Sequence, residues 1–174
     1  LAGFYTCDLG NFRLKAGTQF EYFHYHSDLY GVDGSNLKHS PDHFLNYFVS
    51  FAMDTYDRRY FPSRGGRIQL QGKLHTDDGL SYDDGKPFGD VALHAECALR
   101  CSPRFYIIPK LKARALLGNT IPAIYQNYVG GISDAYYLPW QMAWESSQHT
   151  HLLERNVAAA QLSLRYRLKK KFYV

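Results

Sequence analysis

Long stretches of strictly alternating residues constrain the fold of this chain more than any other feature of its sequence. In residues 67–75, RIQLQGKLH, every even position is apolar or glycine, and every odd position is charged or polar. Successive side chains of a β-strand point to opposite faces, so this pattern predicts a strand with one apolar face and one polar face.

The same alternation recurs along most of the chain and predicts six full strands and two partial ones. Full strands are expected at residues 12–22, 45–55, 67–75, 91–100, 107–115 and 158–168, with partial strands at 1–7 and 172–174. About eleven residues is long for a strand, since strands of soluble sheets typically have five or six. Pro109 cannot donate a ladder hydrogen bond, so we expect a bulge or an edge position there.

Short and long connections alternate between these strands. Short turns are expected at residues 8–11, 57–66, 102–104 and 169–171, and long polar loops at 27–43, 76–89 and 118–154. A meander of long strands with short turns at one end and long loops at the other is typical of outer-membrane barrels. The predicted fold is therefore all-β, an antiparallel transmembrane β-barrel meander that is only part of a barrel.

The two faces of the strands fit a membrane. About nine to eleven tilted residues cross the hydrocarbon layer, with apolar residues toward lipid and polar residues toward water. Four tyrosines near strand ends are expected to form an interfacial girdle: Tyr22, Tyr47, Tyr106 and Tyr166. The alternative is a soluble, lipocalin-like barrel whose apolar face lines a ligand cavity. Dependence on detergent separates the two.

Composition excludes several other classes. A net charge of +4, with Lys and Arg scattered along strands, argues against a nucleic-acid partner. No run of about 18 apolar residues exists, so no transmembrane helix is expected. The opening residues do not resemble a signal peptide. Cys7, Cys97 and Cys101 are interpreted as small apolar residues, because Cys97 and Cys101 would be about 13 Å apart on one strand face.

The sequence predicts no catalytic residue, no cofactor and no metal site in this chain. No G-x-S-x-G elbow is present, so there is no patatin-type serine nucleophile. The pairs His24–His26 and His149–His151 lack a third ligand at metal-site spacing. Two Asp-Asp-Gly runs, residues 77–79 and 83–85, lack an EF-hand pattern and are interpreted as turns.

The connector DRRYFPSRGG, residues 57–66, carries the most distinctive short motif. Pro62 fixes its own backbone angle, and Gly65 and Gly66 permit positive φ, which together predict a sharp return of the chain. Its charged residues either form an ion-paired plug at the turn end of a barrel or are solvated turn charges. These charges are Asp57, Arg58, Arg59 and Arg64.

This connector resembles the "D…D…FPxRG" turn of the bacterial surface-antigen superfamily, with Phe61, Pro62, Arg64 and Gly65 at the matching positions. Members of that superfamily have sixteen-stranded barrels and include BamA-type insertases and two-partner secretion transporters. A second resemblance lies at Val129, Gly130, Gly131 and Ile132, where the superfamily has a valine-arginine-glycine-aromatic motif on a loop that folds into the lumen. Here Gly130 replaces the arginine and Ile132 the aromatic residue.

The Gly-Gly pair, followed by YYLPW at residues 136–140, is also similar to barrels fused behind patatin-like phospholipases, especially in Bacteroidota. The resemblance covers about residues 12 to 174. It implies a Gram-negative outer-membrane location, a periplasmic turn at 57–65 and a lumenal loop at 129–132. It further implies membrane anchoring with translocation or insertion of polypeptide, or alternatively the barrel of a lipid hydrolase whose catalytic domain lies upstream.

Open strand edges are prohibitive in lipid because they leave backbone groups unpaired. We therefore expect residues 1–174 to be one barrel segment, incomplete at both ends. The expected partners are outer-membrane lipids and the remaining strands of the same protein, with polypeptide substrates or other outer-membrane subunits as further candidates.

Overall fold

The computed structural model describes most of the chain. The described residues are 1–23, 42–82, 85–119, 121–131, 141–144, 150–169 and 172–173, and for residues 42, 123, 150–153, 169, 172 and 173 only the backbone is described. The predicted His pairs, the second Asp-Asp-Gly run, Ile132 and residues 136–140 lie wholly or partly outside this set.

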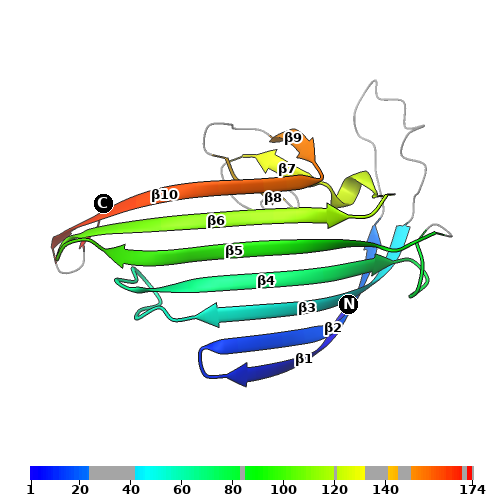
Figure 1. Cartoon of the computed structure of the whole chain (residues 1–174), viewed down its shortest axis with the longest axis horizontal. Helices are drawn as coiled ribbons and strands as arrows, with labels where there is room; N and C mark the ends of the chain where they lie inside the picture. The colour runs from blue at the N-terminus through cyan, green and yellow to red at the C-terminus, as the bar shows by residue number, and fades with distance from the viewer. Residues whose placement is uncertain are drawn as a thin grey trace.

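The structure is a single large antiparallel sheet with a small second sheet on one of its faces (Figure 1). The elements are β1 (Ala2–Leu9), β2 (Phe12–Phe23), β3 (Asp42–Asp54), β4 (Gly65–Thr76), β5 (Phe88–Arg100), β6 (Phe105–Leu117), η2 (Ala123–Tyr125), β7 (Asn127–Gly130), β8 (Gln141–Met142), β9 (Thr150–Glu154), β10 (Asn156–Lys169) and β11 (Phe172–Tyr173). No helix in this part of the chain is long and apolar enough to cross a membrane.

The large sheet is a meander in the order β1-β2-β3-β4-β5-β6-β10-β11. Six of its strands have 12 to 14 residues, and β1 and β11 are shorter edge strands. The predicted fold class and the prediction of six full and two partial strands are confirmed. The small sheet, in the order β8-β7-β9, lies within the connection predicted as one long loop, and the sequence did not predict it.

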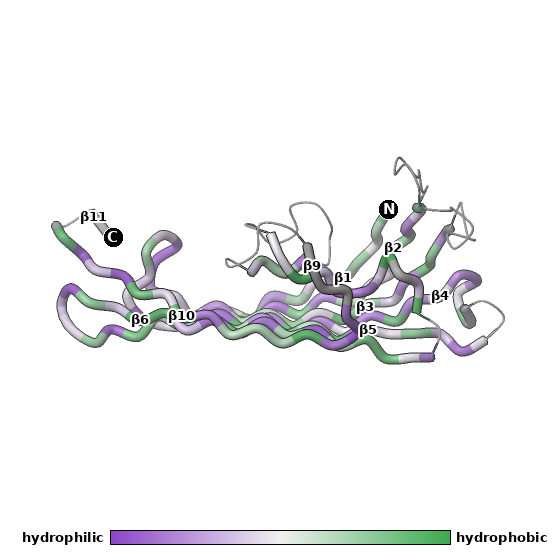
Figure 2. Tube along the Cα trace, turned by 90° about the horizontal axis from the view of Figure 1, so that it is seen from above, coloured by the Kyte–Doolittle hydropathy of each residue, from purple (hydrophilic) through white to green (hydrophobic). Residues whose placement is uncertain are grey.

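Hydrophilic and hydrophobic residues alternate along the long strands (Figure 2), and this alternation sorts their side chains between the two faces of the sheet. One face of the large sheet, the outer face, presents apolar side chains with nothing packed over them, including Leu14, Val49, Leu70, Leu111 and Leu162. The opposite face, the inner face, carries the polar side chains. Residues 121–127, which we call the β6–β7 segment and which include the first residue of β7, lie on the side of this face together with the small sheet. Burial is concentrated there, around a core of Phe44, Phe88 and Tyr125. The polar face is therefore covered at this end, around the core residues.

Pro109 does not occupy an edge. β6 pairs with both β5 and β10, and Pro109 lies opposite Leu162 of β10. The β5–β6 register is unchanged on either side of it, from Glu96↔Lys110 to Leu99↔Ile107, with no register shift. The expected bulge or edge is wrong, because a local gap in one ladder accommodates the missing N–H.

Two further predictions need correction. Tyr106 has only 2% of its surface exposed and lies on the inner face, under the Arg165 guanidinium, 4.9 Å from the ring centroid. It cannot belong to an outer girdle, whereas Tyr22, Tyr47 and Tyr166 are exposed on the outer face. Cys101 lies in the turn after β5, not on the strand with Cys97, and all three cysteines are free.

Candidate functional site: a polar network that holds the β6–β7 segment on the sheet

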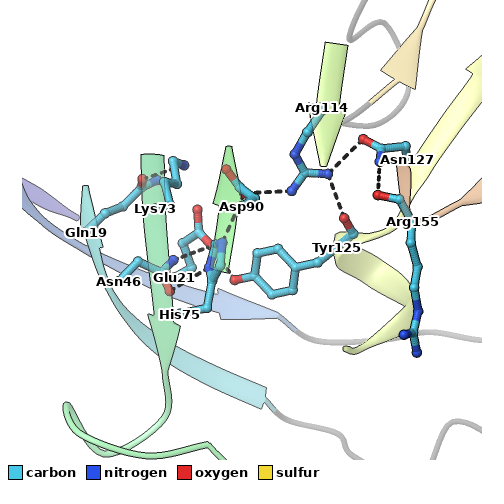
Figure 3. A network of polar contacts seen from close by, with 10 residues as sticks. All are labelled: Gln19, Glu21, Asn46, Lys73, His75, Asp90, Arg114, Tyr125, Asn127 and Arg155. Atoms are coloured by element: carbon cyan, nitrogen blue, oxygen red, sulfur yellow. Dashed lines mark hydrogen bonds and ion pairs between the residues drawn. The ribbon is translucent and has the colours of Figure 1, made fainter. Parts of the chain in front are cut away.

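A network of buried and half-buried polar side chains gathers at the long-loop end of the inner face (Figure 3). Its members come from five consecutive long strands and from the β6–β7 segment. They are Glu21 of β2, Asn46 of β3, His75 of β4, Asp90 of β5, Arg114 of β6, and Tyr125 and Asn127 of the segment. Alternation places all five strand residues on one face, and the ladder registers bring them side by side.

Tyr125 is the centre of the packing. Its side chain is 0% exposed, and its ring lies 5.0 Å from Phe44, 5.2 Å from Phe88 and 4.3 Å from the His75 ring, centroid to centroid. The short η2 turn supplies this tyrosine from above the sheet. An aromatic cluster of this kind buries a large apolar area, which fixes the segment to the wall.

The Tyr125 hydroxyl begins a chain of hydrogen bonds across the strands. It donates to Glu21 Oε2 over 2.6 Å, and Asn46 Nδ2 donates to the same oxygen over 2.8 Å. Asn46 Oδ1 therefore faces His75 Nδ1, at 2.9 Å. His75 Nε2 lies 3.1 Å from Asp90 Oδ2. Both ring nitrogens thus lie within hydrogen-bond distance of a side-chain oxygen of a neighbouring strand.

Arg114 completes the network from β6. Its Nη2 donates to Asp90 Oδ2 over 2.7 Å. Its Nη1 donates to the backbone carbonyl of Tyr125 over 2.7 Å and to Asn127 Oδ1 over 3.0 Å. Asn127 Nδ2 in turn donates to the Arg155 carbonyl over 2.9 Å, where β9 meets β10. One buried guanidinium thus joins the wall, the segment and the small sheet.

The predicted motif at Val129, Gly130 and Gly131 lies just beyond this network. Val129 and Gly130 end β7, and Gly130 and Gly131 are buried, with φ of 129° and 87°. Gln141 Nε2 donates to the Gly130 carbonyl over 2.9 Å, and the Trp144 amide donates to the Gly131 carbonyl over 3.1 Å. Two consecutive positive φ values explain the glycine pair, because side chains with a Cβ disfavour that conformation.

Gly131→Ala is expected to loosen this part of the small sheet by about 1–3 kcal/mol. A Cβ at residue 131 would lie 2.3 Å from Gln141 Nε2, at a φ of 87° that strains any L-residue. Faster hydrogen exchange of the β7 amides, measured by mass spectrometry on the full-length protein in detergent, checks this result. Gly3→Ala is the control, because a Cβ there meets nothing within 4 Å. Unchanged β7 exchange would contradict the prediction.

The predicted turn motif is held by hydrogen bonds rather than by ion pairs. Asp57 accepts from the Ser63 amide over 2.8 Å, from the Ser63 hydroxyl, and from the Arg64 amide over 3.2 Å. The Arg58 guanidinium is farther away, at 3.9 Å. The Ser63 hydroxyl, with the two amides, lowers the pKa of Asp57 to about 2. The stability gained from the carboxylate is thus present above pH 3.8 and is lost as the pH falls toward 2.

The predicted connector does not form a tight turn. The connection between β3 and β4 spans residues 55–64 and reaches the inner face of β10. There Arg165 donates to the Pro62 carbonyl, and its guanidinium lies 5.9 Å from the Phe61 ring centroid. Phe61 has a φ of 52°, the one positive φ of a non-glycine residue in the described ranges. Arg58 and Arg59 are exposed and Gly65 begins β4.

The two sequence-predicted motifs are at opposite ends of the sheet and do not form one site. The network was not predicted from the sequence, although its five strand residues had been placed on the polar faces of their strands; Tyr125 and Asn127 fell in a predicted loop. One signal was available in the sequence: a glutamate, an asparagine, a histidine, an aspartate and an arginine stand at the long-loop ends of five successive strands. In the described part of the chain no cluster of residues could hold a metal ion.

The geometry of long antiparallel strands with an apolar outer face agrees with the family to which the sequence is similar. The family model of the OMP85 superfamily matches residues 4–174. The chain belongs to the OMP85 superfamily. No curated protein matches it significantly. Members of the superfamily are outer-membrane proteins of Gram-negative bacteria, so this chain is an outer-membrane barrel domain. The predicted superfamily is confirmed.

Proposed function

We propose that this OMP85 domain anchors its parent protein in the outer membrane and forms part of a wall through which polypeptide is passed or inserted. The main support for this proposal is the docking of the β6–β7 segment on the polar face. A buried arginine, a buried tyrosine and an aromatic cluster hold the segment, so that it fills the interior space beside the long-loop end. A segment held at these points can be released as a unit, which suits a lumen that opens and closes.

The orientation of the faces supports a membrane wall over a soluble carrier. A lipocalin-like barrel turns its apolar face inward around a ligand. Here the apolar side chains are exposed on the outer face and the covered face carries charges. In this proposal lipid tails cover the outer face, and further strands of the same protein pair with β1 and β11.

The barrel of a patatin-like phospholipase, with a catalytic domain upstream, remains the second proposal. It differs from the first only in what is fused to the wall. A G-x-S-x-G elbow in the upstream sequence would favour the hydrolase, and polypeptide-transport repeats would favour the translocator.

Reconstitution of the full-length protein into liposomes tests the proposed function. We expect it to accelerate the folding of an added, urea-unfolded outer-membrane barrel, read as heat-modifiable mobility on a gel. Liposomes that hold an unrelated porin are the control. A folding rate no higher than in the porin liposomes would contradict the insertion role. A full-length chain that stays monomeric and soluble without detergent would sink the membrane role altogether.

A further inference from the structure

Charge on the inner face changes along the strands. At the long-loop end the acids and bases of the network are joined to each other, whereas from the short turns to the middle of the sheet bases predominate. In the described strands, eight basic residues there face three acidic ones. The bases, which we call the basic stripe, are Arg13, Lys15, Arg67, Arg100, Lys110, Lys112, Arg165 and Arg167, and the acids are Asp8, Asp54 and Glu96.

Two bases of the stripe form ion pairs with the three acids. Arg13 Nε lies 2.6 Å from Asp8 Oδ1. Arg67 Nη2 lies 2.7 Å from Asp54 Oδ2, and its Nη1 lies 3.9 Å from Glu96 Oε1. These pairs cancel charge at the two residues that stand nearest the short turns on β2 and β4.

Three other arginines of the stripe donate to backbone carbonyls, which do not cancel their charge. Arg165 donates to Pro62, Arg167 to Pro103 over 2.7 Å, and Arg100 to Ser102 over 3.3 Å. These bonds hold the guanidinium groups in place at the short-turn end of the inner face. Their positive potential extends into the water above the sheet.

Lys110 and Lys112 stand in the middle of the stripe. They are two residues apart on β6, so their Cα atoms are about 7 Å apart on one face. In the β5–β6 register, Lys110 lies opposite Glu96 and Lys112 opposite His94. His94 Nε2 is buried and makes no hydrogen bond within the described residues. The two lysines of β6 and His94 of β5 thus stand side by side on the inner face.

We propose that the basic stripe binds acidic segments of the polypeptide that the barrel handles, a role that rests on the proposed function. The bases are spread over five strands, two each on β2, β6 and β10 and one each on β4 and β5. An extended chain with carboxylates at intervals can reach many of them at once, whereas one small anion meets two or three. A lining of Arg and Lys also favours anions electrostatically, as in anion-selective pores.

Peptide binding to the full-length protein in detergent micelles tests this proposal. The probes are fluorescein-labelled deca-glutamate and deca-lysine, read by fluorescence anisotropy at low salt. We expect deca-glutamate to bind, deca-lysine not to bind, and added salt to weaken the complex. The double variant Lys110→Gln/Lys112→Gln is expected to weaken deca-glutamate binding about tenfold, the usual order for two lost charge contacts. Lys86→Gln, at an exposed loop position, is the matched control and should bind as the wild type does.

Equal binding of both peptides, or unchanged affinity in the double variant, would overturn the proposal. Heat-modifiable mobility on a gel reports whether each variant has folded. If the double variant fails to fold, Lys15→Gln replaces it, with a smaller expected loss. Competition with unlabelled anions separates a peptide site from a simple anion site. If inorganic phosphate displaces labelled deca-glutamate as well as unlabelled deca-glutamate does at the same concentration of negative charge, the proposal is overturned. If the protein binds deca-glutamate but does not accelerate the folding of an added barrel, the result supports peptide binding by the basic stripe and contradicts the proposed insertion function.

Discussion

Arg114→Ala is expected to release the β6–β7 segment from the wall and to lower the free energy of unfolding by about 3–5 kcal/mol, the usual cost of removing one partner of a buried ion pair. The loss is large because one guanidinium serves three acceptors. Asp90 would keep a buried charge without its arginine, and the Tyr125 carbonyl and Asn127 Oδ1 would each lose a donor. An unsatisfied buried acceptor adds its own desolvation cost.

Maleimide labelling of Ile124→Cys measures the release directly, in a full-length background in which Cys7, Cys97 and Cys101 are serine. Ile124 packs against the Phe44, Phe88 and Tyr125 core, so a cysteine there reacts slowly while the segment is docked. We expect labelling to accelerate at least tenfold with Arg114→Ala, and urea denaturation to report the loss of stability. Arg104→Ala, in an exposed turn, is the matched control. Equal labelling rates in the two variants would contradict the prediction that Arg114 holds the β6–β7 segment on the sheet.

Leu162→Arg is expected to destabilise the inserted barrel by about 2–4 kcal/mol, as for a basic residue facing lipid at the bilayer midplane. Leu162 stands near the middle of β10 on the outer face, with 64% of its surface exposed. In this position only lipid can surround the introduced charge.

Ser163→Arg is the matched control for this variant, because the next residue of the same strand points to the inner face. Folding titrations in lipid vesicles measure both, with the fraction folded read by gel mobility. We expect Ser163→Arg to remain within about 1 kcal/mol of the wild type, since water reaches the inner face. Equal penalties for the two arginines would contradict the assignment of the faces.

The sequence predicted the sheet well because each strand encodes its own two faces. Alternation from Arg67 to His75 needs no knowledge of the neighbouring strands, and it places His75 on the polar side. Hairpin turns such as residues 102–104 are equally local. The same local signal failed for Tyr106: its position near a strand end suggested a girdle, while its even place in β6 assigns it to the inner face.

The docked segment could not be predicted in this way. Its decisive bond joins Tyr125 to Glu21 across 104 residues, and Arg114 meets Asp90 across 24. No periodicity relates Tyr125 to Glu21, because the sequence before β7 shows no alternation that would place Tyr125 over the sheet. The glycine pair at 130–131 was recognised as a motif, but only the structure gave its physical reason, two consecutive positive φ values.

The sequence by itself therefore determined the strands of the large sheet and their two faces, since these follow from side-chain period and turn composition within each strand. Only the tertiary structure decided what covers the polar face and where the connector at residues 55–64 goes. Both depend on hydrogen bonds and ring contacts between distant elements, which exist only after the ladder registers have placed Glu21, Asn46, His75, Asp90 and Arg114 side by side.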